Sequence, residues 1–228
     1  MENDYFFEPY KGNWYDDPTK NIFGGKRVLV VGHNHNCIEE REPKTSETIC
    51  RKNCLAQSEK CSKKTWDIID WYKSYKVNGG ERPRSSNTFT KFGNFLTNYE
   101  ENFTILEAYE SIAFYNYCQY AVPDWNAQPI ETQELNQYKD SERAFLNVLE
   151  EFSPDIVIVW SVDKVFNKLP NCYADSKILL TDFKRKFGLK KYNINSKEII
   201  IIGIQHPMAF CPSKWHDIIF PKFMQLRK

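Results

Sequence analysis

The sequence of 228 residues contains no long apolar segment, and its longest apolar runs cover residues 28–31, 156–160 and 199–202. A membrane-spanning helix needs about 20 apolar residues, so we expect no membrane span and no membrane partner. The first residues are acidic and lack an apolar stretch, which predicts that no secretory signal is present. Seven cysteines without an export signal indicate reduced thiols. We therefore expect a cytoplasmic protein.

Common cofactor and catalytic motifs are also missing. The turn after residue 31 lacks the second glycine of a dinucleotide-binding loop and the Gly-Lys-Ser/Thr of a phosphate loop. There is no Gly-x-Ser-x-Gly elbow. Four cysteines, Cys37, Cys50, Cys54 and Cys61, are the best metal candidates, but no Cys-x-x-Cys pair is present. We expect no cofactor, with zinc or an iron–sulfur cluster on these cysteines as the alternative.

Charge is nearly balanced overall, at +1, but it is unevenly distributed. Residues 98–155 contain twelve acidic and two basic residues, whereas residues 177–228 contain eleven basic and three acidic residues. The basic C-terminal quarter, with clusters at 184–186 and 190–191, favours a polyanionic partner. Ordinary solvated faces and turns explain the same pattern equally well.

Four short, nearly all-apolar segments predict buried strands, separated by segments of helical length. The strands are expected at 28–32, 112–116, 156–160 and 199–204, and helices at 66–75, 88–97, 134–152, 163–169 and 213–226. This pattern predicts an α/β fold with a central four-stranded parallel sheet flanked by helices on both faces. We expect a single domain over residues 1–228. It includes an aromatic N-terminal arm (1–25) and a cysteine-bearing loop insertion (33–64).

Polar residues follow three of these strands directly. Asn34, Asn116 and His206 each stand at the carboxyl end of a separate predicted strand. Ligands of parallel α/β sheets bind at these ends, so we expect the three side chains to converge on one cleft. Pro207 stiffens the backbone after His206. A single histidine after a strand is more often structural, and it is the coincidence of three polar strand ends that favours a functional site.

The order of these motifs resembles the uracil-DNA glycosylase superfamily over residues 27–226. Its members have a strand leading into Gly-x-[Asp/Asn/Ala]-Pro and a strand ending in Asn. A helix and an apolar strand ending near Trp-Gly follow, and then a strand leading into His-Pro-Ser-Pro-Leu. The matching segments are 28–34, 112–116, 134–161 and 199–210. The resemblance implies a three-layer α/β sandwich and a monofunctional DNA N-glycosylase. Such an enzyme flips out uracil, or a related modified or 5-substituted pyrimidine, and excises it by hydrolysis.

The resemblance also implies roles for individual residues. Asn34 would hold the attacking water, Asn116 would read the edge of the flipped base, and His206 would hydrogen-bond to its O2. The catalytic candidates are Asn34, His35 and His206, the base-binding candidates are Gly32, Asn36 and Asn116, and the DNA-binding candidates are Pro207, Met208, Phe210 and Lys214. Phe210 stands where the family has its intercalating wedge. The expected partner is single- or double-stranded DNA, bound by a monomer.

Three positions depart from the family pattern. His35 replaces the proline of the first motif, Asn36 replaces the bulky tyrosine that excludes a 5-methyl group, and Met208 replaces a serine. Asn36 therefore leaves room for a 5-substituted base. The alternative is an inactive protein of glycosylase fold that binds nucleic acid or a protein partner. A third interpretation is a zinc-stabilised interaction module built on residues 37–61.

Overall fold

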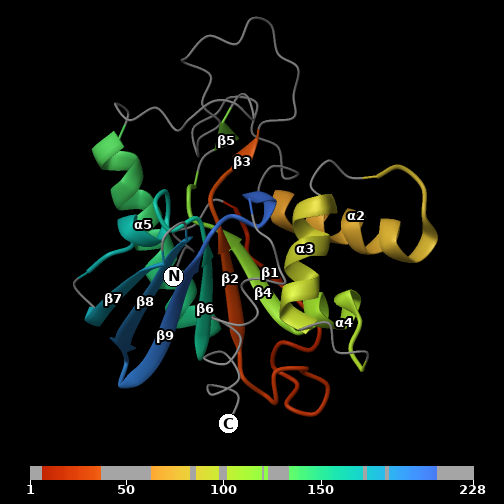
Figure 1. Ribbon diagram of the computed structural model, residues 1–228, viewed down its shortest axis with the longest axis horizontal. Helices are drawn as coiled ribbons and strands as arrows, with labels where there is room; N and C mark the ends of the chain where they lie inside the picture. The colour runs from red at the N-terminus through yellow and green to blue at the C-terminus, as the bar shows by residue number, and fades with distance from the viewer. Residues whose placement is uncertain are drawn as a thin grey trace, which may run out of the picture.

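A seven-stranded mixed sheet forms the centre of the molecule, in the order β1-β4-β2-β6-β9-β8-β7 (Figure 1). The computed structural model describes residues 7–36, 63–82, 86–97, 102–119, 121–122, 134–171, 174–182 and 185–209. The strands of this sheet are β1 (Tyr10–Lys11), β2 (Val28–Gly32), β4 (Ile112–Asn116), β6 (Ile156–Trp160), β7 (Ala174–Asp182), β8 (Arg185–Ile194) and β9 (Lys197–Ile204). A second, two-stranded sheet pairs β3 (His35–Asn36) with β5 (Ala121–Val122).

The four predicted strands lie side by side at the centre of the sheet. β2 pairs in parallel with β4 on one side and with β6 on the other, and β6 pairs in parallel with β9. Every residue of β2, β4 and β6 is buried, as expected when both faces of a parallel sheet are covered. The predicted four-stranded parallel sheet is therefore present, as the core of a larger one.

Antiparallel strands extend this core at both edges, which the sequence interpretation missed. β1 pairs with β4 at one edge, and the β7–β8 hairpin joins β9 at the other. The turn between β8 and β9 uses Asn195 and Ser196, both at positive φ, as in a tight two-residue hairpin. The cluster 190–191 is not a solvated turn, because it lies within β8. Lys190 is fully buried, and Lys191 forms an ion pair with Glu198 at 3.0 Å.

Helices cover the two faces of the sheet. They are α2 (Lys64–Asn78), α3 (Ser86–Thr97), α4 (Ile105–Glu110) and α5 (Glu134–Phe152), with 3₁₀ turns η1 (Phe166–Lys168) and η2 (Pro207–Ala209). Helix α5 has the predicted bounds, and α2 and α3 are slightly longer than predicted. A helix was predicted over 163–169, but only turns and η1 form there. The unpredicted α4 begins with a capping box between Thr104 and Glu107.

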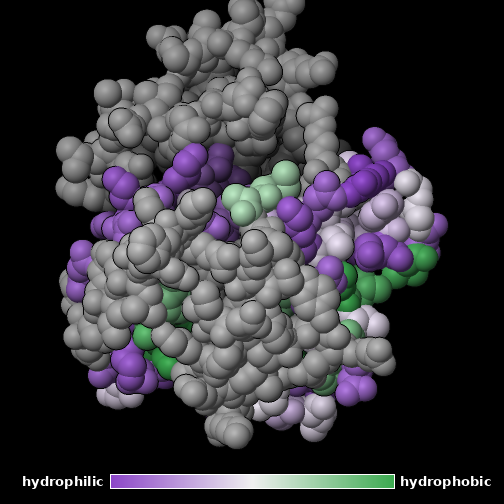
Figure 2. Space-filling view, in the orientation of Figure 1, coloured by the Kyte–Doolittle hydropathy of each residue, from purple (hydrophilic) through white to green (hydrophobic). Residues whose placement is uncertain are grey.

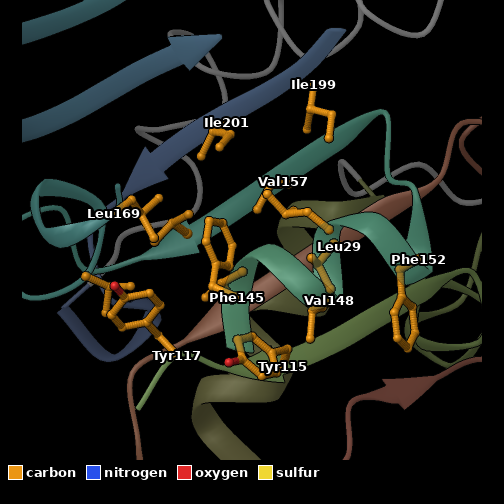
Figure 3. Packing of buried hydrophobic residues seen from close by; sticks show 14 of the residues in the cluster. Leu29, Tyr115, Tyr117, Phe145, Val148, Phe152, Val157, Leu169, Ile199 and Ile201 are labelled. Carbon is orange, nitrogen blue, oxygen red and sulfur yellow. The ribbon is translucent and has the colours of Figure 1, made fainter. Parts of the chain in front are cut away.

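Alternate residues of each central strand point into two separate cores. Buried residues of α2, α3 and α4 pack with Val28, Val30 and Ile158 on one face. Buried residues of α5 pack with Leu29 and Val157 on the other face, as Figure 3 shows. The carboxyl ends of the parallel strands point toward the small β3–β5 sheet (Figure 1). Polar residues at these ends are therefore held by a frame that is packed on both sides.

The described part of the predicted N-terminal arm packs onto the body. Tyr10 and Tyr15 are buried, and the Trp66 indole of α2 donates to the Pro9 carbonyl at 2.9 Å. Helix α2 lies at one side of the molecule, where hydrophilic and hydrophobic residues mix on the surface (Figure 2). Among the helices in the described ranges, none has both the length and the apolar character needed to cross a membrane.

Candidate functional site

The candidate site lies at the carboxyl ends of the four parallel strands, on the face covered by α2, α3 and α4. Side chains alternate along a strand, and Phe114 and Trp160 belong to the core on this face. Two residues beyond Phe114, Asn116 lies on the same face, as does Gly32 two residues beyond Val30. Local strand geometry therefore places Gly32, Asn116 and Trp160 together at one end of the sheet.

The amide of Asn116 lies directly over Gly32. The two residues are register partners in neighbouring strands, and Asn116 is 6 % exposed. A Cβ added to Gly32 would overlap with Oδ1 of Asn116 and would lie 3.0 Å from Cζ of Phe114. Only glycine leaves the space that this amide occupies. An amide offers a donor and an acceptor together, as the edge of a pyrimidine requires.

The imidazole of His206 follows β9 and is held at one nitrogen. The Met208 N–H donates to Nδ1 of His206 at 3.2 Å, within the turn that η2 forms. An imidazole nitrogen that accepts a hydrogen bond carries no proton, so the neutral ring is protonated at Nε2. The arrangement therefore provides an N–H donor at Nε2 for an acceptor on a ligand.

Trp160 connects these groups. Its ring contacts the Phe114 ring at a centroid distance of 5.0 Å and the His206 ring at 5.6 Å, both edge to face. Trp160 is 4 % exposed, and its Nε1 has no hydrogen-bond partner among the described residues. Asn116, Phe114, Trp160 and His206 thus form one continuous cluster on one face of the sheet.

Burial and nearby positive charge lower the pKa values of the two histidines whose side chains are described, His33 and His206. Burial, together with the smaller effects of the charges of Lys164 and His206, lowers the pKa of His33 to about 4. Burial and the charge of Lys164 also lower the pKa of His206. Both imidazoles are therefore neutral near pH 7. Lys164 is exposed, and its positive charge acts on both imidazoles.

The loop that carries Lys164 is anchored against the β8–β9 edge. It begins at Ser161, which has a φ of 73°. The Phe166 ring packs over two glycines, because a Cβ on Gly203 would lie 2.6 Å from its Cγ. Lys190 Nζ donates to the carbonyls of Phe166 (3.0 Å) and Leu169 (3.2 Å). The buried lysine thus supplies a hydrogen-bond donor for two backbone groups of this loop.

Other predicted site residues are placed as follows. Asn34 is half-buried and is the second residue after β2, while Pro207 is buried and Met208 is 55 % exposed in η2. His35 and Asn36 form β3, and only their backbone is described. Outside the described residues lie the candidates Phe210 and Lys214, the predicted helix 213–226, and the metal candidates Cys37, Cys50, Cys54 and Cys61.

Two residues of the candidate site, Trp160 in the cluster and Lys164 beside it, were not among the predicted site residues. Trp160 is the last residue of an apolar strand, and this position could have singled it out. Lys164 follows four residues later in a stretch that was predicted to be helical, so no pattern pointed to it. Within the described ranges, no group of three or more His, Cys, Asp or Glu side chains is arranged to hold a metal ion.

No protein-family model matches the chain, and a comparison with curated proteins gives no significant match. The residues and their geometry are therefore the basis of the functional proposal.

Proposed function

We propose that the protein is a monofunctional DNA glycosylase. It flips out uracil or a related 5-substituted pyrimidine and hydrolyses the N-glycosidic bond. The observation that carries the proposal is the placement of the Asn116 amide over Gly32 and of a His206 ring protonated at Nε2 at the same end of the parallel core, after β4 and β9. The motif order of the uracil-DNA glycosylase superfamily, in a three-layer α/β sandwich, is consistent with this arrangement.

In the proposed reaction the leaving base departs with negative charge, and the protein stabilises that charge. The Nε2–H of His206 donates to the base carbonyl O2, and the Asn116 amide pairs with the edge of the base. Lys164 adds a positive charge on the same side. Asn34 holds the water that attacks the sugar. The bond between base and sugar breaks, and the water supplies the hydroxyl group on the sugar and a proton for the base.

Ser161 gives additional support. It occupies the place of the glycine in the family's Trp-Gly pair, directly after Trp160. Its φ of 73° lies in the left-handed region that favours glycine. The backbone therefore takes a glycine-like conformation at this position although the side chain differs.

Labelled oligonucleotides, each with one uracil or one 5-substituted pyrimidine, test the proposal in single- and double-stranded form. Hot alkali converts an abasic site into a strand break, which is read on a denaturing gel. We expect breaks at the test base, and about 10²-fold or more slower turnover in His206→Ala and in Asn116→Ala. Lys76→Met, in the exposed last turn of α2, is the matched control and should keep normal turnover.

The same gel shows whether the enzyme excises only uracil or also 5-substituted pyrimidines. The wider range is expected, because Asn36 replaces the tyrosine that excludes a 5-methyl group in the family. If every strand stays intact, the enzyme proposal is refuted. DNA binding that weakens steeply with salt would then support the inactive, nucleic-acid-binding alternative.

A further inference from the structure

The turn that carries His206 is tied to helix α3 by one lysine. Lys91 lies in the middle of α3, and its Nζ donates to the Met208 carbonyl at 3.2 Å. The N–H of Met208 donates to Nδ1 of His206. Met208 is therefore held from both sides, by the lysine at its carbonyl and by the imidazole at its N–H.

Helix α3 reaches the same imidazole by a second path. Phe92, the next residue after Lys91, packs edge to face on the Trp160 ring at 4.9 Å, and Trp160 contacts the His206 ring. The apolar face of α3 is buried, with Phe92 fully covered and Phe89 5 % exposed. This helix is thus a rigid base that supports the ring through Trp160 and the adjacent turn through Lys91.

We propose that Lys91 is a positioning residue, which holds the 206–209 turn so that His206 keeps its Nε2–H tautomer. Without the ammonium group, the Met208 carbonyl loses its side-chain donor. The turn then retains the Ala209 N–H to His206 carbonyl bond of 2.9 Å, but the Met208 N–H is less firmly aligned with Nδ1. Part of the molecules would then carry the proton on Nδ1, and these present no donor at Nε2.

The consequence for catalysis rests on the proposed function, but the effect on the tautomer does not. Lys91→Met keeps the length of the side chain and removes the donor, whereas Lys91→Arg keeps a donor. In the free, full-length protein labelled with ¹⁵N-histidine, the ring nitrogens of His206 report which nitrogen is protonated. We expect the Nε2–H form in the wild type, a mixture in Lys91→Met, and recovery in Lys91→Arg. Unchanged resonances in Lys91→Met would overturn the proposal.

Lys76→Met is the matched control, because it removes the same charge from exposed surface of a different helix. It should leave the His206 resonances unchanged. Excision assays add a second readout, in which Lys91→Met lowers kcat about tenfold, as slight misplacement of a catalytic group does. The salt dependence of DNA binding should keep its wild-type slope.

A different result would show that Lys91 contacts a phosphate instead. The slope of log Kd against log salt would then fall by about one in Lys91→Met, with the tautomer unchanged, and the positioning role would be refuted. If the wild-type protein excises no base, the proposed function fails, while the ¹⁵N measurement still decides the role of Lys91.

Discussion

Replacing Gly32 by alanine tests whether the Asn116 amide is fixed over the end of β2. The new Cβ would overlap with Oδ1 of Asn116 and would lie 3.3 Å from its Cγ and 3.0 Å from Cζ of Phe114. β2 cannot shift freely, because it is paired on both sides. The amide must therefore rotate inside a packed core. Overpacking of this kind costs about 1–3 kcal/mol, and we expect a loss of stability in this range.

Urea unfolding of the wild type, Gly32→Ala, Asn116→Ala and the double variant measures the coupling. Truncating Asn116 removes the main overlap and leaves only the Phe114 contact. We therefore expect Gly32→Ala to cost about 1 kcal/mol less in that background, within the usual range for contacting residues. Equal costs in both backgrounds would refute the placement of the amide over Gly32.

Gly12→Ala is the matched control, because its Cβ would overlap with the Glu110 carbonyl beside the opposite end of β4. The Gly12 N–H donates to the Ile112 carbonyl at 2.9 Å. Ile112 is four strand residues, roughly 13 Å, from Asn116. The losses in unfolding free energy caused by Gly12→Ala and by Asn116→Ala should therefore be additive within about 0.5 kcal/mol. In excision assays, Gly32→Ala should be about as slow as Asn116→Ala, whereas Gly12→Ala should keep wild-type turnover.

Further predictions concern pH, backbone strain and a buried charge. Because the pKa of His33 is lowered to about 4 from about 6.5 in the unfolded chain, the unfolded state binds more protons between these values. Stability should rise by up to about 3 kcal/mol from pH 4 to 6.5 and then level off, and urea unfolding of His33→Asn should show a flatter profile. Lys164→Met should raise the pKa of both His33 and His206 in an NMR titration; unchanged values would exclude Lys164 as a cause. Ser161→Gly should stabilise the protein by up to about 1 kcal/mol, because it relieves a left-handed conformation at some cost in chain entropy, and a lower melting temperature would contradict this. Lys190→Met should destabilise it by about 2 kcal/mol or more in urea unfolding, because two carbonyls lose their donor, and wild-type stability would show that they find other partners.

The central strands could be predicted because each is a short, continuous apolar run. The runs at 28–31 and 156–160 need cover on both faces, and a parallel sheet provides it. Helix α5 was predicted over its full length for a similar reason, since its apolar residues recur at helical spacing. Both patterns, the continuous apolar run and the helical spacing, can be found within a short segment, because each records which side chains must be buried.

The hairpin β7–β8 was not predicted, because its charges looked like a surface cluster. Lys190 is buried only because the turn that begins at Ser161 directs two carbonyls toward it. Helix α4 was missed for a different reason. Its capping box at Thr104 and Glu107 was visible in the sequence, but the helix is only six residues long, too short for a periodic pattern.

The sequence by itself determined the parallel core, the main helices and the polar residues at the strand ends, because these follow from the apolar pattern of short segments and from the helix-length segments that separate the strands. Tertiary structure alone decided which groups meet there. It placed the Asn116 amide over Gly32 and turned Nδ1 of His206 to the Met208 N–H. It also brought Lys91 to the Met208 carbonyl and the charge of Lys164 close to the His206 ring. Apart from the His206–Met208 bond, which joins residues two apart, these contacts join residues far apart in the chain, so they arise from packing rather than from any local pattern.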